Sequence, residues 1–481
     1  MSCPLFCWRL GISYVKSCLF GGRRKISDFI IVSHAKGANV SDTQRAEAIA
    51  AIKDSDIEFI HLWFTDVLGF LKTFVISVDE IDVAMDEGMG FDGSSIQGFA
   101  RIQESDMIAM PDPSTLKIMP WRDEGQLVAT MFCDINKPDG SPYEGDPRYV
   151  LKRTLRKAAE EGYTFYTGPE LEYYYFEDDA STKLLDKASY FDMTTRDIGV
   201  DLRKQTVRSL KSFDIQVEYS HHEVGPSQHE IDLRYSEALR MADIVMTYRL
   251  VVKEVAQQNG VYATFMPKPM YGEAGSGMHV HQSLFRGDKN AFFDASDQYH
   301  LSAEAKGYIA GILHHAPAIT AITNQWVNSY KRLVSGFEAP VHVCWAHRNR
   351  SALVRVPMYK PGKEKATRIE LRSPDPACNP YLAFAVMLAA GLDGIKKGMV
   401  LEPDVVEDVY EMSDAERSER GIGRLPGDLI NAVKALENSE LLRETLGEPL
   451  FSWYVRNKRI EWDSYRSRVT SWELEEYLPL L

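Results

Sequence analysis

One short segment carries three charged side chains that could bind an anion and a cation together. In Arg368-Ile369-Glu370-Leu371-Arg372, charged and branched apolar residues alternate strictly, which is typical of a β-strand. Arg368, Glu370 and Arg372 are therefore predicted to share one face, with Ile369 and Leu371 buried on the other. Two arginines flanking a glutamate are hard to explain as surface decoration, so the segment indicates a binding site.

The same alternation places acids and histidines on one face of three further predicted strands. The residues that share a face are Glu170 with Glu172, Glu230 with Asp232 and Arg234, and His279 with His281. The candidate metal ligands are Glu170, Glu172, Glu223, Glu230, His279 and Glu370. Five carboxylates and one imidazole, with no thiolate, favour Mg²⁺ or Mn²⁺ over structural zinc. A solvated strand face explains any one acid alone, whereas acids that converge inside a protein repel one another and need a cation.

Arginines cluster between residues 328 and 355, at Arg332, Arg348, Arg350 and Arg355. Guanidinium groups bind carboxylates and phosphates with two parallel hydrogen bonds, although a surface salt bridge would also explain Arg348. The segment from Ser335 to Pro340 is too short and too rich in helix- and strand-breaking residues for an element, and it is predicted to be a mobile flap. No Walker A or Rossmann motif occurs, so any ATP site is of another type.

Composition limits the class of protein. With 481 residues, 44% of them hydrophobic, two soluble domains are the natural expectation. The net charge of −14 argues against nucleic acid or an anionic membrane as a partner. No apolar run reaches transmembrane length. The six cysteines form no metal-binding spacing and indicate free thiols in a reducing cytoplasm.

The first residues differ from the rest of the chain. Residues 1–27 contain five basic residues and no acid, as a targeting peptide would, but they lack a clean apolar core and a cleavage site. Residues 1–42 are therefore predicted to be an N-terminal extension, either disordered or an artefact of the assigned translation start.

Periodicity and breakers predict two domains of unequal size. The small α+β domain, residues 43–138, contains a helix at 44–54, strands at 57–64, 70–77 and 127–134, and a short helix at 79–87. The breaker-rich segment 137–142 ends it. The large domain, residues 145–481, contains helices at 147–161, 199–213 and 236–258, and strands at 163–176, 215–222, 229–235, 261–267 and 277–285. Its last hundred residues are predicted to be mostly helical and to end in a helix at 454–476.

Eight motifs resemble, in content and order, those of class I glutamine synthetases. They are Phe91-Asp-Gly-Ser-Ser-Ile, Gly168-Pro-Glu-Leu-Glu, His221-His-Glu-Val, Gly275-Ser-Gly-Met-His, Asn328-Ser-Tyr-Lys-Arg-Leu-Val, Glu338-Ala-Pro, Asn349-Arg-Ser-Ala and Arg368-Ile-Glu-Leu-Arg. The resemblance covers about residues 44–481, and the residues around Glu461-Trp462 are similar to the subgroup without the long regulatory insertion. It implies an α+β protein with a small β-grasp-like N-terminal domain. The large α/β catalytic domain would have a curved antiparallel sheet forming a metal-lined funnel.

The resemblance also implies ligands for two or three Mg²⁺ or Mn²⁺ ions in each active site. By this likeness Glu172, Glu223 and Glu230 hold the first ion, and Glu170, His279 and Glu370 hold the second. Glu218 matches a further metal position near the nucleotide.

Substrate contacts follow from the same resemblance. Arg350, Arg355 and Arg368 would stabilise the transferred γ-phosphoryl group of ATP, whereas Arg332, Arg372 and the Gly275 backbone would bind glutamate. Further nucleotide contacts are implied for His281, Ser283, Lys365 and Tyr235.

The implied reaction joins ammonium to the γ-carboxylate of L-glutamate through γ-glutamyl phosphate, giving L-glutamine, ADP and phosphate. Phosphorylation is needed because a carboxylate oxygen is a very poor leaving group. Asp92, from a neighbouring subunit, would deprotonate ammonium in a pocket lined by Ser95, Tyr190 and Glu223. Glu338 would cover the acyl phosphate. A cytoplasmic homo-oligomer, a dodecamer in this family, is implied.

Two departures from the family pattern leave alternatives open. Ala274 stands where the family usually has Asn, and Ser335 where it usually has Pro, and both positions touch glutamate or the flap. A relative that joins glutamate to a polyamine or another amine is the alternative function. A non-catalytic regulator would be expected to lose metal ligands or arginines, and none is lost here. Arg101 resembles a residue that couples feedback inhibitors to the site, and Tyr410 lies where some relatives are adenylylated.

Overall fold

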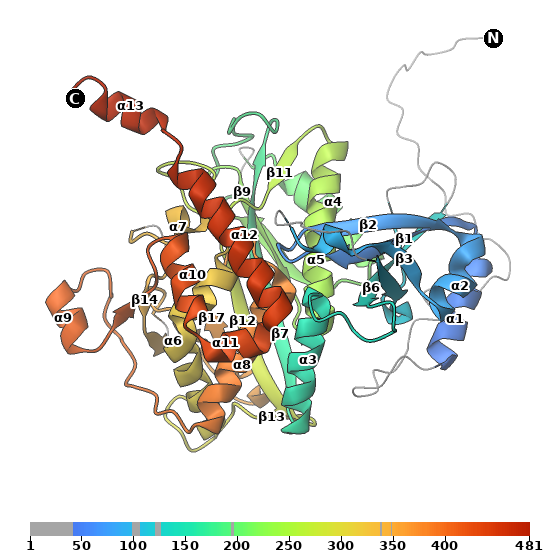
Figure 1. Ribbon diagram of the computed structural model, residues 1–481. Coiled ribbons are helices and arrows are strands. Elements are labelled where there is room, and N and C mark those ends of the chain that lie inside the picture. Colours follow the sequence, from blue (N-terminus) through green and yellow to red (C-terminus); the bar gives the residue numbers. More distant parts are fainter. Residues whose placement is uncertain (1–41, 99–105, 121–126, 194–196, 337–338, 348) are drawn as a thin grey trace, which may run out of the picture.

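The computed structural model describes residues 42–98, 106–120, 127–193, 197–336, 339–347 and 349–481. A small N-terminal domain lies beside a larger domain built from a long sheet and many helices (Figure 1). One buried apolar cluster lies within the small domain. A second, larger cluster fills the large domain and also includes Trp63, Leu68 and Phe132 of the small one. The predicted α+β class is thus confirmed. The N-terminal extension and Arg101, Arg348 and Glu338 lie outside the described residues.

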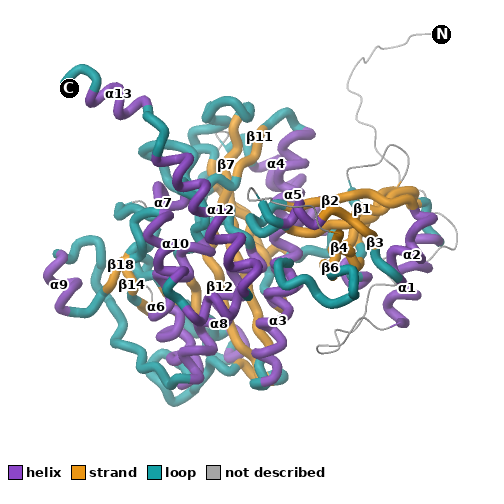
Figure 2. Tube along the Cα trace, in the orientation of Figure 1, coloured by secondary structure: helices purple, strands orange, loops and turns teal. Residues whose placement is uncertain are grey.

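The small domain is a six-stranded sheet with two helices. Its strands are β1 (Ile57–Thr65), β2 (Leu71–Ser77), β3 (Met89–Asp92), β4 (Asp106–Pro111), β5 (Lys117–Ile118) and β6 (Leu127–Asn136), in the order β2-β1-β6-β4-β3 with β5 beside β6. Among the strand pairs that the structure describes in this domain, only β1 and β6 are parallel. Helices α1 (Asp42–Lys53) and α2 (Ile81–Asp86) lie at its outer end (Figure 2). Ile60, Leu62, Ala129 and Met131 are fully buried in its core because alternate residues of β1 and β6 face the same side.

The large domain is organised around one long strand, β7 (Thr164–Phe176). On one side β7 pairs with β12 (Met278–Arg286), and on the other with β9 (Gln228–Leu233), both antiparallel. The sheet order is β15-β16-β17-β12-β7-β9-β8. The remaining strands are β8 (Val217–His222), β10 (Ser236–Glu237), β11 (Tyr262–Thr264), β13 (Lys289–Asn290), β15 (Trp345–His347), β16 (Val354–Val356) and β17 (Ile369–Leu371), and β14 (His342–Val343) pairs with β18 (Gly423–Arg424).

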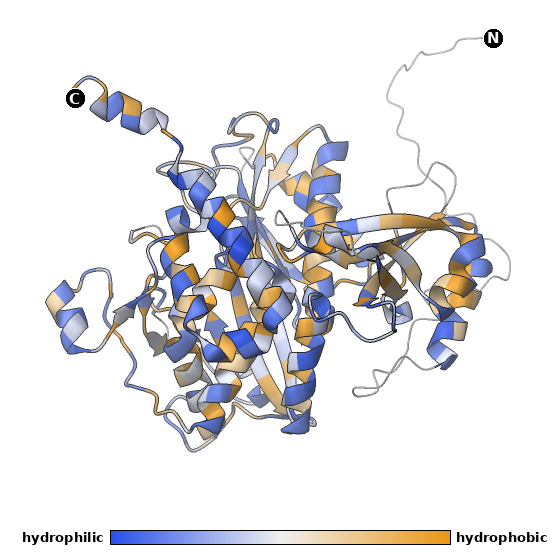
Figure 3. Ribbon diagram, in the orientation of Figure 1, coloured by the Kyte–Doolittle hydropathy of each residue, from blue (hydrophilic) through white to orange (hydrophobic). Residues whose placement is uncertain are grey.

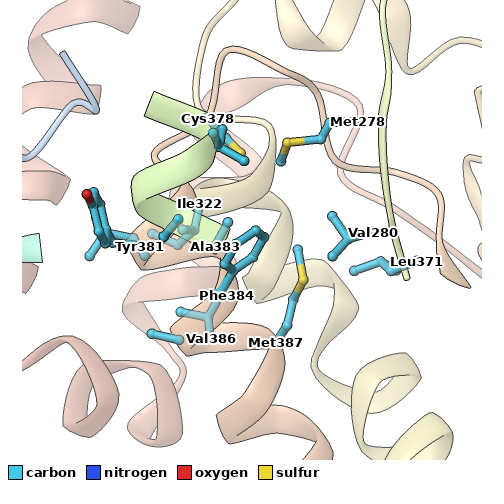
Figure 4. Close-up of a cluster of buried hydrophobic side chains, with 14 of the residues drawn as sticks. Met278, Val280, Ile322, Leu371, Cys378, Tyr381, Ala383, Phe384, Val386 and Met387 are labelled. Carbon is cyan, nitrogen blue, oxygen red and sulfur yellow. The ribbon is translucent and has the colours of Figure 1, made fainter. Parts of the chain in front are cut away.

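The described helices of this domain are α3 (Pro147–Glu160), α4 (Val200–Ser212), α5 (Ala238–Gln258), α6 (Ala303–Thr323), α7 (Ser329–Arg332), α8 (Pro380–Lys396), α9 (Asp414–Glu419), α10 (Leu429–Glu437), α11 (Glu440–Leu446), α12 (Glu448–Arg466) and α13 (Ser471–Tyr477). Most of them contribute buried residues to the domain, whereas α9 and α13 have none and project from it (Figure 1). Figure 4 shows Phe384 and Met387 of α8 beside Val280 of β12 and Leu371 of β17. The apolar backs of the site-bearing strands are therefore fixed by α8, which is buried along most of its length.

Helix α6 is absent from the sequence-predicted elements. It is apolar on nearly every side and contains Pro317, so neither an amphipathic period nor an unbroken run marks it. Glycines allow α6 and α8 to approach closely, since a Cβ on Gly311 would lie 2.1 Å from the Ala390 carbonyl oxygen.

The single C-terminal helix predicted at 454–476 is wrong. Helix α12 ends at Arg466, and a new helix, α13, begins after Thr470. The Thr470 hydroxyl accepts a hydrogen bond from the Glu473 backbone N–H, and the Glu473 carboxylate accepts from Thr470 N–H. This reciprocal cap satisfies free backbone donors and so starts a separate helix.

Three buried amide side chains of the large domain hold the backbone of the small one. The donor-to-acceptor distances are 2.7 Å from Gln325 to the Leu68 carbonyl, 3.1 Å from Asn379 to that of Asp66, and 2.9 Å from Asn457 to that of Gln97. Gly69 and Gly98 have positive φ values of 83° and 68° there. A Cβ at either position would lie 2.9 Å from Asn379 Cα or Asn457 Oδ1, respectively, so both positions require glycine.

Candidate active site

The pairing of β12, β7 and β9 brings the predicted metal ligands into register. His279 lies directly opposite Glu170, which in turn lies opposite Asp232. Two residues further along β7, Glu172 lies opposite Glu230. Directly opposed residues point to the same face of a sheet, so five ionisable groups from three strands face one space.

The first ligand cluster consists of Glu170, His279 and Glu370, whose ligand atoms lie within 4.8 Å of one another. His279 Nδ1 is 3.6 Å from an oxygen of each carboxylate. Burial, and after it Arg372, lowers the pKa of His279, so its ring is neutral at pH 7, the form that binds metal ions. Burial would raise the pKa of Glu370, but His281, His279 and nearby arginines outweigh it and hold that pKa below its usual value.

The second cluster groups His221 with Glu223 and Glu230, again within 4.8 Å. His221 Nδ1 is 3.4 Å from Glu223 Oε1, and His221 Nε2 is 3.8 Å from Glu230 Oε2. Burial and the adjacent Asp232 raise the pKa of Glu230 well above its usual value. Glu172, the third member predicted for this site, lies beside Glu230 in register.

Both clusters fit a hard divalent cation. Glu370 Oε1 and Asp232 Oδ1 are buried and have no hydrogen-bond partner among the residues that the structure describes. Buried acceptors of this kind are rare unless an ion or water satisfies them. Because the donors are carboxylate oxygens with a few imidazole nitrogens, Mg²⁺ or Mn²⁺ suits the set.

A glycine-containing turn supports Glu172 and Arg332. Glu172 Oε2 accepts hydrogen bonds from Gly277 N–H at 3.0 Å and from Gln228 Nε2 at 2.9 Å. A Cβ on Gly277 would lie 2.5 Å from Arg332 Nη2, and one on Gly275 would lie 2.7 Å from Arg332 Cγ. The two glycines therefore allow the guanidinium group to lie directly against the turn.

Arg332 is a buried arginine whose orientation is fixed by backbone carbonyl groups, and Arg372 is buried as well. Arg332 Nη1 donates to the Ser373 carbonyl oxygen at 2.7 Å, and its Nη2 donates to that of Arg372 at 3.3 Å. Arg355 Nε lies 2.5 Å from Glu370 Oε2. Arg350 is exposed but close enough to Arg372 to act with burial and Arg355 in lowering the pKa of that guanidinium.

A cleft joins these groups, and it is lined by Glu172, Glu223, Val224, Gln228, Ala274, Gly275, His279, Arg332, Ala339 and Arg372. Its lining contains carboxylates, an imidazole and the buried guanidinium groups of Arg332 and Arg372. The structure therefore brings together predicted metal ligands and predicted carboxylate-binding residues.

The residues predicted for the nucleotide lie along one side of the first cluster. Arg368 Nε donates to His281 Nδ1 at 3.1 Å, so His281 Nε2 carries the hydrogen directed at Glu170 Oε1, 2.8 Å away. Ser283 follows on the same face of β12. Tyr235 is 61% exposed, with its ring edge against Tyr166.

Two further residues predicted to lie at the nucleotide are exposed. Lys365 lies in a short 3₁₀ turn. Glu218 is the extra residue of a bulge in β8, which aims it away from the regular pleat.

The predicted ammonium pocket is only partly assembled within this chain. Tyr190 lies edge-on to His221, with 5.6 Å between ring centres, beside the second cluster. Asp92 and Ser95 belong instead to the small domain. There the Asp92 carboxylate accepts from Ser94 N–H at 2.9 Å and from the Ser94 hydroxyl at 2.7 Å, and the Ser95 hydroxyl donates to the Asp92 carbonyl. Neither lines the cleft.

Several site residues are missing from the sequence-predicted set. His221 and Asp232 lie within the sequence motifs, but histidines in such a run are usually structural, and a solvated strand face explains a single acid. Gln228 carried no signal, since it reaches Glu172 only after the β8–β9 turn forms. A third buried group, Asp186, Asp197, His222 and His229, lies behind Glu223, and its members are too far apart in sequence to form a motif.

Two family models match the chain in succession. The model of the glutamine synthetase β-grasp domain matches residues 56–138, and that of the glutamine synthetase catalytic domain matches residues 144–477. The predicted β-grasp-like domain and large catalytic domain with its curved sheet are thereby confirmed.

Known proteins resemble the chain over nearly its full length. It is 52% identical over 445 residues to a glutamine synthetase of Mycolicibacterium smegmatis, covering 91% of this chain and 100% of that protein. A Methanosarcina mazei glutamine synthetase is 47% identical over 443 residues, covering 91% and 98%.

Solved structures of related proteins also resemble the chain over nearly its full length. A structure titled GmaS/ADP complex matches with a TM-score of 0.82 at 31% identity, covering 90% of this chain and 99% of that chain. A Plasmodium falciparum glutamine synthetase matches with a TM-score of 0.80 at 27% identity, covering 92% and 100%. The chain therefore belongs to the glutamine synthetase family.

Proposed function

We propose that this protein joins ammonium to the γ-carboxylate of L-glutamate at the expense of ATP, through γ-glutamyl phosphate, and releases L-glutamine, ADP and phosphate. One observation carries the proposal: two carboxylate–imidazole clusters and buried arginines meet in one cleft, in a chain that belongs to this family. The reaction needs that combination, because ATP brings anionic phosphates and glutamate brings two carboxylates to one place.

We assign the metal ions to the two clusters. Glu170, His279 and Glu370 would hold one, and Glu172, Glu223 and Glu230, with His221 beside them, would hold the other. When bound, Mg²⁺ or Mn²⁺ neutralises phosphate charge and polarises the phosphoryl oxygens. A third ion near Glu218 belongs to the same proposal.

The guanidinium groups bind the anionic parts of the substrates. Arg332 and Arg372 bind the glutamate carboxylate, with the Gly275 backbone beside the amino group. Arg350, Arg355 and Arg368 stabilise charge on the γ-phosphoryl group, and His281, Ser283, Lys365 and Tyr235 hold the nucleotide. Because backbone carbonyl groups hold Arg332 in place before substrate arrives, little reorganisation of this side chain is needed.

The acceptor pocket needs a second subunit in this proposal. The Glu223 carboxylate attracts ammonium by its charge, and the Tyr190 ring by a cation–π contact. Ser95 and Asp92 of a neighbouring copy complete the pocket. Asp92 then takes a proton from ammonium, and Glu338 shields the acyl phosphate from water. Ser94 donates hydrogen bonds to both carboxylate oxygens of Asp92 and so fixes the orientation of that carboxylate.

The assembly is a homo-oligomer, and we propose a dodecamer located in the cytoplasm. Exposed apolar side chains on β1 and β2, including Phe59 and Val75, and on α13, including Trp472, support self-association. Figure 3 shows the apolar colouring of β2 on the outside of the small domain. Among the residues that the structure describes, no helix is long and apolar enough to cross a membrane.

The test is phosphate release by purified protein with ATP, Mg²⁺ and glutamate, comparing ammonium with putrescine, spermidine and ethanolamine. Ammonium-driven release with equimolar glutamine supports the proposal. Release driven only by an amine would assign the protein to γ-glutamyl-amine synthesis, which relatives named glutamine synthetase at 45–52% identity do not favour.

A further inference from the structure

A buried network of charged side chains lies directly behind Glu223. Asp186, Asp197, Arg203, His222 and His229 are each at most 6% exposed. The distances alone would allow a metal ion among the acids and histidines. However, Arg203 donates to both oxygens of Asp197, at 2.7 and 3.2 Å, and lies 2.6 Å from His229 Nδ1. A guanidinium in that position would repel a divalent cation, so the network is one of paired charges.

His222 connects this network to the active site. Its Nε2 lies 2.9 Å from Asp186 Oδ1, and its Nδ1 lies 2.7 Å from the Glu223 carbonyl oxygen. Both partners are acceptors, so both ring nitrogens donate and the ring is fixed at each end. Asp186 Oδ1 also accepts from the backbone N–H groups of Ala188 and Ser227, which fixes the carboxylate itself.

Glu223 needs such support because it lies outside a strand. Glu170, Glu172 and Glu230 are directed into the cleft by the pleat of β7 and β9, whereas β8 ends at His222. The Glu223 carboxylate instead accepts a hydrogen bond from Val224 N–H at 2.9 Å. That N–H and the Glu223 carbonyl belong to the same planar peptide group. Fixing the carbonyl through His222 therefore also fixes the N–H that orients the carboxylate.

The same residues fix the other wall of the pocket. Phe191 N–H donates to the His222 carbonyl at 3.1 Å. The Phe191 ring stacks on His221 with 4.4 Å between centres, and Tyr190 packs edge-on against the same ring. Asp186 begins this segment, so its contact with His222 ties the Tyr190 segment to the Glu223 turn.

We propose that Asp186 and His222 are a positioning pair, which sets the direction of the Glu223 carboxylate through the planar peptide between residues 223 and 224. This inference rests on the proposed function, in which Glu223 binds a metal ion and lines the ammonium pocket. The pair touches no substrate; it acts through Glu223.

Two substitutions separate the two ends of the imidazole. In His222→Asn the amide nitrogen takes the place of Nδ1 and keeps the donation to the Glu223 carbonyl. In His222→Gln the amide nitrogen takes the place of Nε2 and keeps the contact with Asp186. We expect His222→Gln to lower kcat/KM for ammonium, and the affinity for Mn²⁺ at one of the sites, by about 10- to 100-fold. His222→Asn should retain most of both. Asp186→Asn, whose amide oxygen can still accept from His222 Nε2–H, should have a smaller effect than His222→Gln.

His315→Gln is the matched control. His315 Nε2 lies 2.8 Å from Asp393 Oδ2, so it forms a similar pair between α6 and α8 away from the cleft, and changing this histidine should leave both quantities unchanged. The KM for ATP should change less than about threefold in all variants. The inference would be overturned if both His222 variants lost kcat/KM equally, in the same proportion for every substrate and with a lower Tm. That result would indicate a purely structural role. Wild-type behaviour of His222→Gln would also overturn the inference.

Mn²⁺ titration, followed by electron paramagnetic resonance of the free ion, keeps the two proposals separate. If the wild-type protein makes no glutamine, the proposed function fails, yet the difference in Mn²⁺ affinity between the two His222 variants still reports the position of Glu223. If glutamine is made and that difference is absent, only the positioning pair fails.

Discussion

At the scale of single residues, Glu370 has the most constrained environment in the site. It is 1% exposed, contacts Arg355 directly, and its pKa stays below the usual value although burial acts in the opposite direction. An ionised carboxylate held in that place is a strong ligand for a cation and a poor general acid. Its expected role is therefore to bind the metal ion nearest the phosphates.

Glu370→Ala should lower ammonium-dependent phosphate release by at least about 100-fold, because it removes a metal ligand and leaves Arg355 and Arg372 without their counter-charge. Steady-state kinetics at saturating Mg²⁺ measures the effect. Glu437→Ala, which removes only a surface partner of Arg459, serves as the control and should change the rate less than twofold. Near-normal turnover of Glu370→Ala would contradict the metal assignment.

Asp92→Ala should act on ammonium far more than on ATP. We expect KM for ammonium to rise about tenfold or more, while KM for ATP changes by less than about threefold, since the proposed role is proton removal from the acceptor. Initial rates with each substrate varied in turn give both values. Weakened ATP use with unchanged ammonium use would show that Asp92 has been assigned to the wrong substrate.

At the scale of elements, the turn before β12 determines where Arg332 lies. Gly277→Ala should displace the guanidinium group, because the new methyl carbon would lie 2.5 Å from Nη2. We expect KM for glutamate to rise about tenfold with little change in Tm, measured by kinetics and thermal melting. Gly427→Ala is the control, because no atom lies within 4 Å of the added methyl group. Gly272→Ala is unsuitable, because its φ of +81° would strain any other residue. An unchanged KM would mean that Arg332 does not bind glutamate.

The start of α3 carries a buried acid whose charge destabilises the fold. Burial, followed by Asp134, raises the pKa of Asp146 to about 7 from 3.8. The folded state thus holds this proton more tightly than the unfolded state, so its contribution is favourable below about pH 4 and is lost as the pH rises through 7.

Asp146→Asn and Asp146→Ser keep a capping oxygen for Arg148 N–H but cannot ionise. The difference in Tm between variant and wild type should therefore be a few degrees more favourable to the variants at pH 8 than at pH 5. Calorimetry at the two pH values tests this sign directly. A difference that is independent of pH would show that Asp146 does not titrate in this range.

The elements also show what sequence can and cannot predict. The faces of β7, β9 and β12 followed from strict alternation, because a pleated strand allows only two directions for a side chain. The β8–β9 turn did not, since Gln228 and Val224 reach the site through backbone geometry that no periodicity encodes. Helix α6 cannot be predicted from periodicity, because a helix that is buried on nearly every side has no amphipathic period.

At the scale of the whole molecule, the end of the chain exposes an apolar surface. In α13 and the residues after it, Trp472, Leu474, Leu478, Leu480 and Leu481 are between 49% and 102% exposed. A capped helix with such a surface is expected to pack against another copy.

Removing residues 470–481 should therefore reduce the size of the assembly, measured by sedimentation velocity or mass photometry at equal protein concentration. Trp472→Ala should weaken it in the same direction. Unchanged particle mass after the truncation would mean that α13 lies outside the subunit interface.

The joint between the domains has a consequence for how such a protein can change over evolutionary time. Gln325, Asn379 and Asn457 hold main-chain carbonyl groups, and every amino acid supplies a carbonyl. Elsewhere the joint does depend on side chains, because Arg148 pairs with Asp112 and Asp134, and Trp63 and Phe132 of the small domain belong to the large core. Around the three hydrogen-bonded carbonyl groups, by contrast, mutations can accumulate without remaking the contact. The exceptions are the glycines at 69 and 98, where any side chain would push the partners apart.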